Sequence, residues 1–306
     1  PGVIALAACG APSEPAPSQP AATLPAEAGR SWERALVFTT LGADSTLVVP
    51  WIFETATRAD EAERSIRSWM YRGESWELFL EDTWQSRPTS APWRLLPRPG
   101  VRLVVGPGDA LASVVHSSPS RALELEFLDS RVEWSANVRE SITMSAARLH
   151  LADAAVDGMV FDLSRARETA AGVAGDFVVL VSGDSLQIAL QTPRVLDPDD
   201  ETVPDEPWSG FARLNLRTIP ISDAQLVWTG RQAFYRARRD VPNAWAISSA
   251  ASGLWASMRV RSALLAAGEG PGPRFPIEGV FTVAGRVVFE GVEYPVQGFY
   301  HHVQNP

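Results

Sequence analysis

The sequence predicts an all-β fold, a barrel or sandwich made of two β units, that follows a disordered tether rich in proline and alanine. Three observations predict it. From residue 31 onward, apolar and polar residues alternate along one short segment after another. Gly, Pro, Asp and Ser separate these segments, and few stretches have helical spacing. With 306 residues, the chain can form one large hydrophobic core or two ordinary ones.

The alternation is clearest in "RALELEFLD" at 121–129 and in "SWELFLED" at 75–82. In the first, Leu123, Leu125 and Phe127 alternate with glutamates, which places the apolar side chains on one face of a strand. The same reading fits "RVEWS", "ARLHLAD", "DSLQIAL", "ARLNLR" and "EGVFTVAGRVVFEG". The best helix candidate is 58–69, "RADEAERSIRSW", which fits equally well as a loop that leads into a strand.

The segment at 192–208, "TPRVLDPDDETVPDEPW", interrupts the strands with four prolines and six carboxylates. Such a composition is typical of a linker. We therefore predict a first β domain at 31–196 and a second at 208–306. The carboxylates do not have the spacing of a calcium loop, so a solvated, self-repelling linker is the preferred interpretation.

The only cysteine lies near the beginning, in the run Leu6-Ala7-Ala8-Cys9. This run resembles the lipobox of bacterial lipoproteins, position by position. The resemblance implies that Cys9 is lipidated and becomes the mature N-terminus, and that residues 1–8 are the remnant of a signal peptide. The lipid would then be the membrane anchor.

Residues 9–30 are expected to be a flexible linker. Positions 10–30 hold five prolines and six alanines and almost no large apolar side chain, so they cannot bury enough surface to offset the entropy of ordering. In lipoproteins of this type the residue after the cysteine influences sorting, and Gly10 is not the aspartate of inner-membrane retention. We expect the periplasmic side of the outer membrane, with the outer leaflet of the inner membrane as the alternative.

Composition excludes several kinds of chemistry. The chain has a net charge of −9 and contains no lysine, which argues against nucleic acid as a partner and excludes Schiff-base and phosphate-loop lysines. A basic stretch at 230–240, "GRQAFYRARRD", is interpreted as a solvated strand edge or turn, although anionic lipid headgroups could contact it. One cysteine allows no intrachain disulfide. No catalytic, metal-binding or nucleotide-binding motif is present, so no catalytic residue, metal or cofactor is predicted.

Four histidines remain as candidates for polar chemistry. His150 is expected to be a half-exposed strand histidine. Adjacent residues on a strand point to opposite faces, so His301 and His302 should not share a metal. His116 stands beside Ser117 at an expected strand end and would need a converging carboxylate to act with it.

Eleven tryptophans are unusually many, at positions 32, 51, 69, 76, 84, 93, 134, 208, 228, 245 and 255. Each large aromatic side chain buries roughly 150–250 Å². This number favours broad core packing, with a ring-walled ligand cavity as the alternative, since small β-barrels can enclose one apolar ligand.

The closing stretch at 275–302, "FPIEGVFTVAGRVVFEGVEYPVQGFYHH", resembles the final strands of the two-domain lipocalin-like family that includes hydroxyneurosporene synthase, a carotenoid hydratase. In that family an aromatic-led Glu-Gly strand is followed by a Gly-aromatic strand. The resemblance implies paired lipocalin-like barrels and an apolar ligand. The family's central His/Asp/Asn motif is not found here, so its hydratase activity is not carried over.

These observations predict a membrane-anchored, extracytoplasmic lipoprotein that binds an apolar small molecule, such as a lipid or a carotenoid-like compound. An accessory subunit that docks on a membrane protein complex through exposed tryptophans is the first alternative. An enzyme that acts on an apolar substrate ranks third, because no polar constellation is visible. A dry cavity of several hundred Å³ would favour binding, and a flat exposed aromatic patch would favour docking.

Overall fold

The computed structural model describes residues 31–304 except 43–45, 59–60, 90–93, 107–109, 138–139, 153, 168–174, 193–206 and 270–271. The described residues form strands and turns, and none of them builds a helix that could cross a bilayer. The predicted lipidation site Cys9, the linker and most of the carboxylate-rich segment lie outside the described residues.

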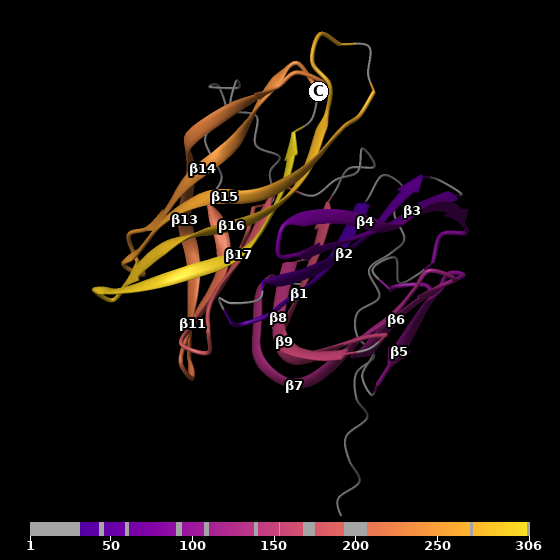
Figure 1. The fold of residues 1–306 in the computed structure, drawn as a ribbon, viewed down its shortest axis with the longest axis horizontal. Helices are drawn as coiled ribbons and strands as arrows, with labels where there is room; N and C mark the ends of the chain where they lie inside the picture. Colours follow the sequence, from indigo (N-terminus) through magenta and orange to yellow (C-terminus); the bar gives the residue numbers. More distant parts are fainter. Residues whose placement is uncertain are drawn as a thin grey trace, which may run out of the picture.

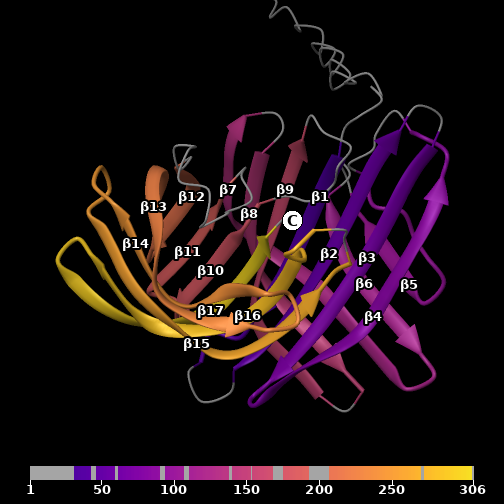
Figure 2. The same cartoon turned by 90° about the horizontal axis from the view of Figure 1, so that it is seen from above.

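The fold is all-β and lipocalin-like, with two β units side by side (Figures 1 and 2). The first unit is a curled nine-stranded antiparallel sheet in the order β4-β3-β2-β1-β9-β8-β7-β6-β5. Its strands are β1 (Ser31–Thr39), β2 (Leu47–Arg58), β3 (Glu61–Arg72), β4 (Ser75–Ser86), β5 (Val101–Val105), β6 (Leu111–Ser118), β7 (Arg121–Asn137), β8 (Glu140–Leu151) and β9 (Ala154–Arg167).

The second unit is a closed eight-stranded barrel in which every neighbour in sequence is a neighbour in space. Its strands are β10 (Phe177–Ser182), β11 (Leu186–Gln191), β12 (Trp208–Leu214), β13 (Arg217–Phe234), β14 (Arg239–Ser249), β15 (Leu254–Ala267), β16 (Ile277–Phe289) and β17 (Val292–Gln304). The barrel closes where β17 pairs with β10. A Cβ on Gly298 would lie 1.9 Å from the Val179 carbonyl oxygen, so only glycine lets the two backbones meet there.

The described residues form three large hydrophobic clusters and one small one. Of the large clusters, one occupies the barrel interior, a second lies between the two units, and a third covers the inner face of the curled sheet. Strand β1 shows how the sequence supplies both faces. Ala35 and Val37 face the barrel, whereas Leu36 and Phe38 face the inside of the curled sheet. Strands buried on both faces read as continuous apolar runs instead of alternating ones.

The change from one sheet to the other falls between β9 and β10, earlier than the sequence predicts. Strands β10 and β11 precede the 192–208 segment, yet they pair within the barrel. Strand β10, "FVVLVS", is almost entirely apolar, and in β11, "LQIALQ", two glutamines alternate with apolar residues although both faces are buried. The proline-rich segment therefore lies between two neighbouring barrel strands, β11 and β12.

Of the two interpretations of 58–69, the helix is wrong, because β2 ends at Arg58 and the residues from Glu61 onward form strand β3. Ala62, Arg64 and Ile66 are buried on one face, and Glu61 and Glu63 are exposed on the other. Because the charged Arg64 occupies one of the buried positions, the sequence alone does not show this alternation of buried and exposed residues. The Arg64 guanidinium donates hydrogen bonds to Thr55 Oγ1 at 3.0 Å and to Ser86 Oγ at 3.0 Å, which offsets its burial.

Candidate functional site

Strands β10, β16 and β17 form part of the outer wall of the barrel that faces the curled sheet. Along β17, Tyr300 and His302 point into the barrel, and the alternate residues Gln297, Phe299 and His301 point outward. The pairing register aligns Gln297 with Val181, Phe299 with Val179 and His301 with Phe177 on β10. Along β17 this wall therefore has three parts. Gln297 lines an open groove, Phe299 belongs to an apolar layer, and His301 belongs to a buried polar cluster.

The groove has a volume of about 1130 Å³ and lies between the two units. The curled sheet contributes Leu41, Thr46 and Tyr71 to it, and the barrel contributes the outward residues of β10, β15, β16 and β17. Apolar, hydroxyl and guanidinium groups all line it. A concave site of this size and mixed lining is the usual form of a small-molecule site.

Hydrogen bonds fix the mouth of the groove. Thr46 Oγ1 donates to Gln297 Oε1 at 2.8 Å, and Gln297 Nε2 donates to the Gly42 carbonyl at 2.9 Å. Tyr71 packs its ring against Trp76 at 5.4 Å between centroids, and its hydroxyl donates to the Gly73 carbonyl at 2.6 Å. The first two contacts connect the β1–β2 turn to the barrel, and the other two fix Tyr71 within the β3–β4 hairpin, so the groove is preformed.

An apolar layer separates the groove from the deeper part of the interface. Phe299 is fully buried and contacts Trp76 at 5.8 Å and Phe177 at 5.7 Å between ring centroids. Trp76 is fixed in turn, because its indole N–H donates to the Ser262 carbonyl at 3.4 Å across the interface. A ligand in the groove meets this layer before any buried charge.

Beyond the layer lies a buried polar cluster, formed by Glu33, Arg165, His301, Glu278 and Arg67. Arg165 and Glu33 form an ion pair that is almost completely buried. Arg165 Nη1 also donates to the carbonyls of Asp176 at 3.1 Å and of Thr192 at 3.3 Å, which ties the curled sheet to the barrel. Arg67 and Glu278 form a second ion pair between the two units.

His301 is the central side chain of this polar cluster. Its Nε2 lies 3.1 Å from Glu278 Oε1, and its ring packs on Phe177 at 5.0 Å. Burial lowers the pKa of His301 to about 4, although the charge of Glu33 opposes the shift. The ring is therefore neutral at physiological pH. Its Nδ1 has no hydrogen-bond partner among the described residues, and neither amide atom of the nearby Gln191 has one.

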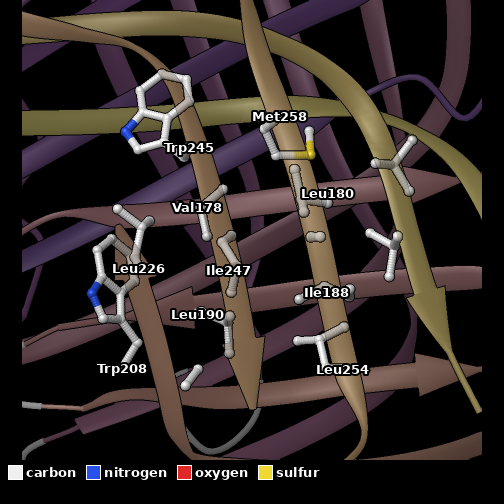
Figure 3. Packing of buried hydrophobic residues seen from close by; sticks show 14 of the residues in the cluster. Val178, Leu180, Ile188, Leu190, Trp208, Leu226, Trp245, Ile247, Leu254 and Met258 are labelled. Carbon is white, nitrogen blue, oxygen red and sulfur yellow. The ribbon is translucent and has the colours of Figure 1, made fainter. Parts of the chain in front are cut away.

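The barrel interior is filled mainly by aliphatic side chains with a few large rings among them, and Figure 3 shows Trp208 and Trp245 in this setting. Trp245 lies 4.6 Å from Tyr300 and 5.8 Å from Phe281 between ring centroids, and Trp208 stacks on Tyr300 at 6.2 Å. The remaining void beside Trp245 is only about 10 Å³. These tryptophans therefore pack the core, which was the preferred interpretation, and the alternative, a ring-walled cavity, is absent at this place.

A second buried network closes one end of the barrel. Asp176 accepts hydrogen bonds from the Val303 backbone N–H at 2.9 Å and from the Tyr300 hydroxyl, and its Oδ2 lies 2.6 Å from His302 Nδ1. Gln304 Nε2 lies 2.9 Å from His302 Nε2, so the imidazole donates through Nδ1 and accepts through Nε2. Burial and the Asp176 charge raise the pKa of Tyr300 well above its usual value. Asp176, Tyr300 and His302 therefore all have partners within this network, whereas Gln304 Oε1 has none among the described residues.

The histidines behave largely as the strand pattern predicts. His301 and His302 point to opposite faces of β17, and His150 is half-exposed beside Glu126 at 3.2 Å. His116 is buried against Phe79 at 5.2 Å, and Ser117 is exposed on the other face of β6, so the two do not act together. In the described part of the chain, no three His, Cys, Asp or Glu side chains are placed to hold a metal ion.

Neither surface feature singled out in the sequence forms a docking patch in the described residues. The basic stretch covers the end of β13, the turn after it and the start of β14, with Tyr235 88% exposed in the turn and Arg239 buried. Of the tryptophans described, only Trp255 is exposed by more than a third, at 40%, and Arg286 covers its ring at 5.7 Å.

Apart from His301, the sequence missed the members of the polar cluster, and it also missed Asp176 of the second network. Glu33 stands in "SWERALVFT" and Asp176 directly precedes "FVVLVS", so each is a carboxylate within or beside a strongly apolar run. A charged side chain in a strand that is buried on both faces needs a buried partner. A carboxylate in an apolar run is therefore the sequence feature that could have predicted a buried polar site. The partner itself, Arg165, is 132 residues away from Glu33 and becomes visible only in the folded chain.

Comparison with known proteins shows a shared fold. The solved structures that resemble this chain include kievitone hydratase from Nectria haematococca, with 11% identity, a TM-score of 0.53 and coverage of 92% of this chain and 91% of that one. A Nitrosomonas europaea protein named as an AttH candidate has 9% identity and a TM-score of 0.54, and the match covers 90% of this chain and 92% of that one. CghA in complex with Sch210972 has 12% identity and a TM-score of 0.51, and the match covers 90% of this chain and 88% of that one. No family model and no curated protein sequence matches the chain.

Proposed function

We propose that this protein is a lipid-anchored, extracytoplasmic binding protein that holds an apolar small molecule in the groove between its two β units. The groove of about 1130 Å³ carries the proposal. Among the described residues of the barrel interior, the packed side chains around Trp245 leave a void of only about 10 Å³. An apolar ligand gains about 25 cal/mol for each Å² removed from water, so a groove of this size can hold one firmly.

The structural neighbours support a small-molecule site in this fold. One of them is named a hydratase and another is described together with the compound Sch210972. Catalysis ranks behind binding for this chain. His301 is the buried base nearest to the groove along β17, but it lies four residues beyond Gln297, roughly 13 Å at strand spacing. The layer of Phe299 and Trp76 stands between them.

Filling the groove should abolish binding. Ala284 on β16 lines the groove, and Ala284→Trp would place an indole inside it. We expect the affinity for a fluorescent fatty acid or a carotenoid to fall by at least about tenfold, because the apolar contact area is taken by the indole. Fluorescence titration of the probe measures the change. Ala233→Trp on the exposed face of β13 is the matched control. Equal affinity in both variants and the parent chain would contradict the groove as the site.

The anchor is tested separately. Cys9→Ser should move the protein from the membrane fraction to the soluble fraction, because lipid chains contribute about 0.8 kcal/mol per buried CH₂ and no other anchor is proposed. Ser13→Ala in the same segment should leave the protein on the membrane. Mass spectrometry of the parent protein should find acyl chains on Cys9. A Cys9→Ser protein that still sediments with membranes would refute the anchor.

A further inference from the structure

One wall of the groove is cationic. Arg259 and Arg261 on β15 and Arg286 on β16 all line it, and Glu293 is the only carboxylate among its lining residues. The chain as a whole carries a net charge of −9. The three guanidinium groups around this groove therefore make it locally positive in an otherwise negative protein. Such a wall attracts an anionic group.

A β-bulge places the second of these arginines. The pairing of β15 with β16 shifts between Val260 and Ser262, which pair with the consecutive residues Val283 and Thr282. Arg261 is therefore the extra residue of the bulge. Bulges reorient one side chain and occur often beside binding sites. Here the shift keeps Val260 packed against the barrel core and leaves Arg261 on the groove.

Two of the three arginines are available to a ligand. Arg286 lies 3.6 Å from Glu293 and covers the Trp255 ring. Arg259 and Arg261 are exposed, and neither forms an ion pair or a side-chain hydrogen bond with any residue that the structure describes. A guanidinium presents a planar fork of donors that fits carboxylate and phosphate oxygens.

A buried hydroxyl in the groove gives an independent indication of a ligand. Thr282 is 2% exposed, lines the groove, and its Oγ1 has no hydrogen-bond partner among the described residues. An unpaired buried hydroxyl costs free energy, and a polar ligand atom could satisfy it. Thr282 on β16 pairs with Ser262, the residue directly after Arg261. The Thr282 hydroxyl and the Arg261 guanidinium therefore belong to the same part of the groove.

We propose that the ligand of this groove is an amphiphile with an anionic head, a carboxylate or a phosphate, held by Arg259 and Arg261. The inference rests on the proposed binding function and names the ligand class. The apolar body of the amphiphile lies against Leu41, Tyr71 and Val181, and a head oxygen accepts a hydrogen bond from Thr282 Oγ1.

The test uses the full chain carrying Cys9→Ser, which requires no detergent if the anchor is the lipid. Dodecanoate, dodecyl phosphate and uncharged dodecanol are titrated by calorimetry below their aggregation limits. The double variant Arg259→Gln/Arg261→Gln should bind dodecanoate about tenfold more weakly, since two charge-assisted contacts in an exposed setting are lost. Its affinity for dodecanol should not change. Arg102→Gln/Arg236→Gln removes the same charge from β5 and from the β13–β14 turn and should leave both affinities as in the parent.

The outcomes separate this inference from the proposed function. If dodecanol binds as tightly as dodecanoate, and the double variant binds both like the parent, the anionic-head inference is overturned while the groove remains a binding site. If no probe binds, both proposals are overturned. Weaker binding of dodecanoate at high salt in the parent, and not in the double variant, supports the ion pair. The tighter of dodecanoate and dodecyl phosphate identifies the head group.

Discussion

Replacing Arg165 with methionine should destabilise the protein by about 3–5 kcal/mol, the usual cost of removing one partner from a buried ion pair. The guanidinium is fully buried and Glu33 is 3% exposed, so the variant leaves a carboxylate without a counter-charge. It also leaves the carbonyls of Asp176 and Thr192 without this donor. Urea unfolding followed by tryptophan fluorescence measures the loss.

Two further variants test the cause of that loss. Arg148→Met removes an arginine from the same sheet, but its partner Asp157 is exposed, so the unfolding midpoint should hardly move. Adding Glu33→Leu to Arg165→Met should restore part of the stability, because no uncompensated charge remains buried. If Arg165→Met lowers the midpoint no more than Arg148→Met, the buried polar cluster does not hold the two units together.

Phe299→Ala should destabilise the protein by a similar amount, about 3–5 kcal/mol, the range for large-to-small changes of a buried aromatic residue. Phe299 is fully buried between Trp76 and Phe177. Its loss removes the layer that separates the groove from the buried polar cluster. Denaturant unfolding reports the stability, and Phe275→Ala, which truncates a partly buried ring, should cost clearly less. Equal losses in the two variants would show that Phe299 is not part of a packed layer.

The strand pattern predicted most of the fold from local chemistry. Alternation in segments such as "RALELEFLD" identifies a strand because one of its faces is buried and the other meets water. Because adjacent residues of a strand point to opposite faces, the sequence also predicted that His301 and His302 lie on opposite faces, as the structure shows. Alternation was uninformative in β10, where both faces are buried and almost every residue is apolar, and misleading in β3, where the buried Arg64 occupies an inward position.

The groove could not be predicted from the sequence, because no single segment encodes it. It forms where the turns around Thr46 and Tyr71 meet the outer wall of a barrel that begins more than 100 residues later. The tryptophan count suggested a cavity inside the barrel, but Trp208 and Trp245 fill that space. Closely packed interiors leave few voids, so the space for a ligand lies between the two packed units.

The most direct test of the account is to locate a bound ligand. A crystal structure of the Cys9→Ser chain with a bromine-labelled fatty acid would place the tail by its anomalous signal. We expect the bromine in the groove, against Leu41, Tyr71 and Val181. A bromine inside the barrel among Trp208 and Trp245, or a saturated crystal with no bromine in the groove, would contradict the central claim.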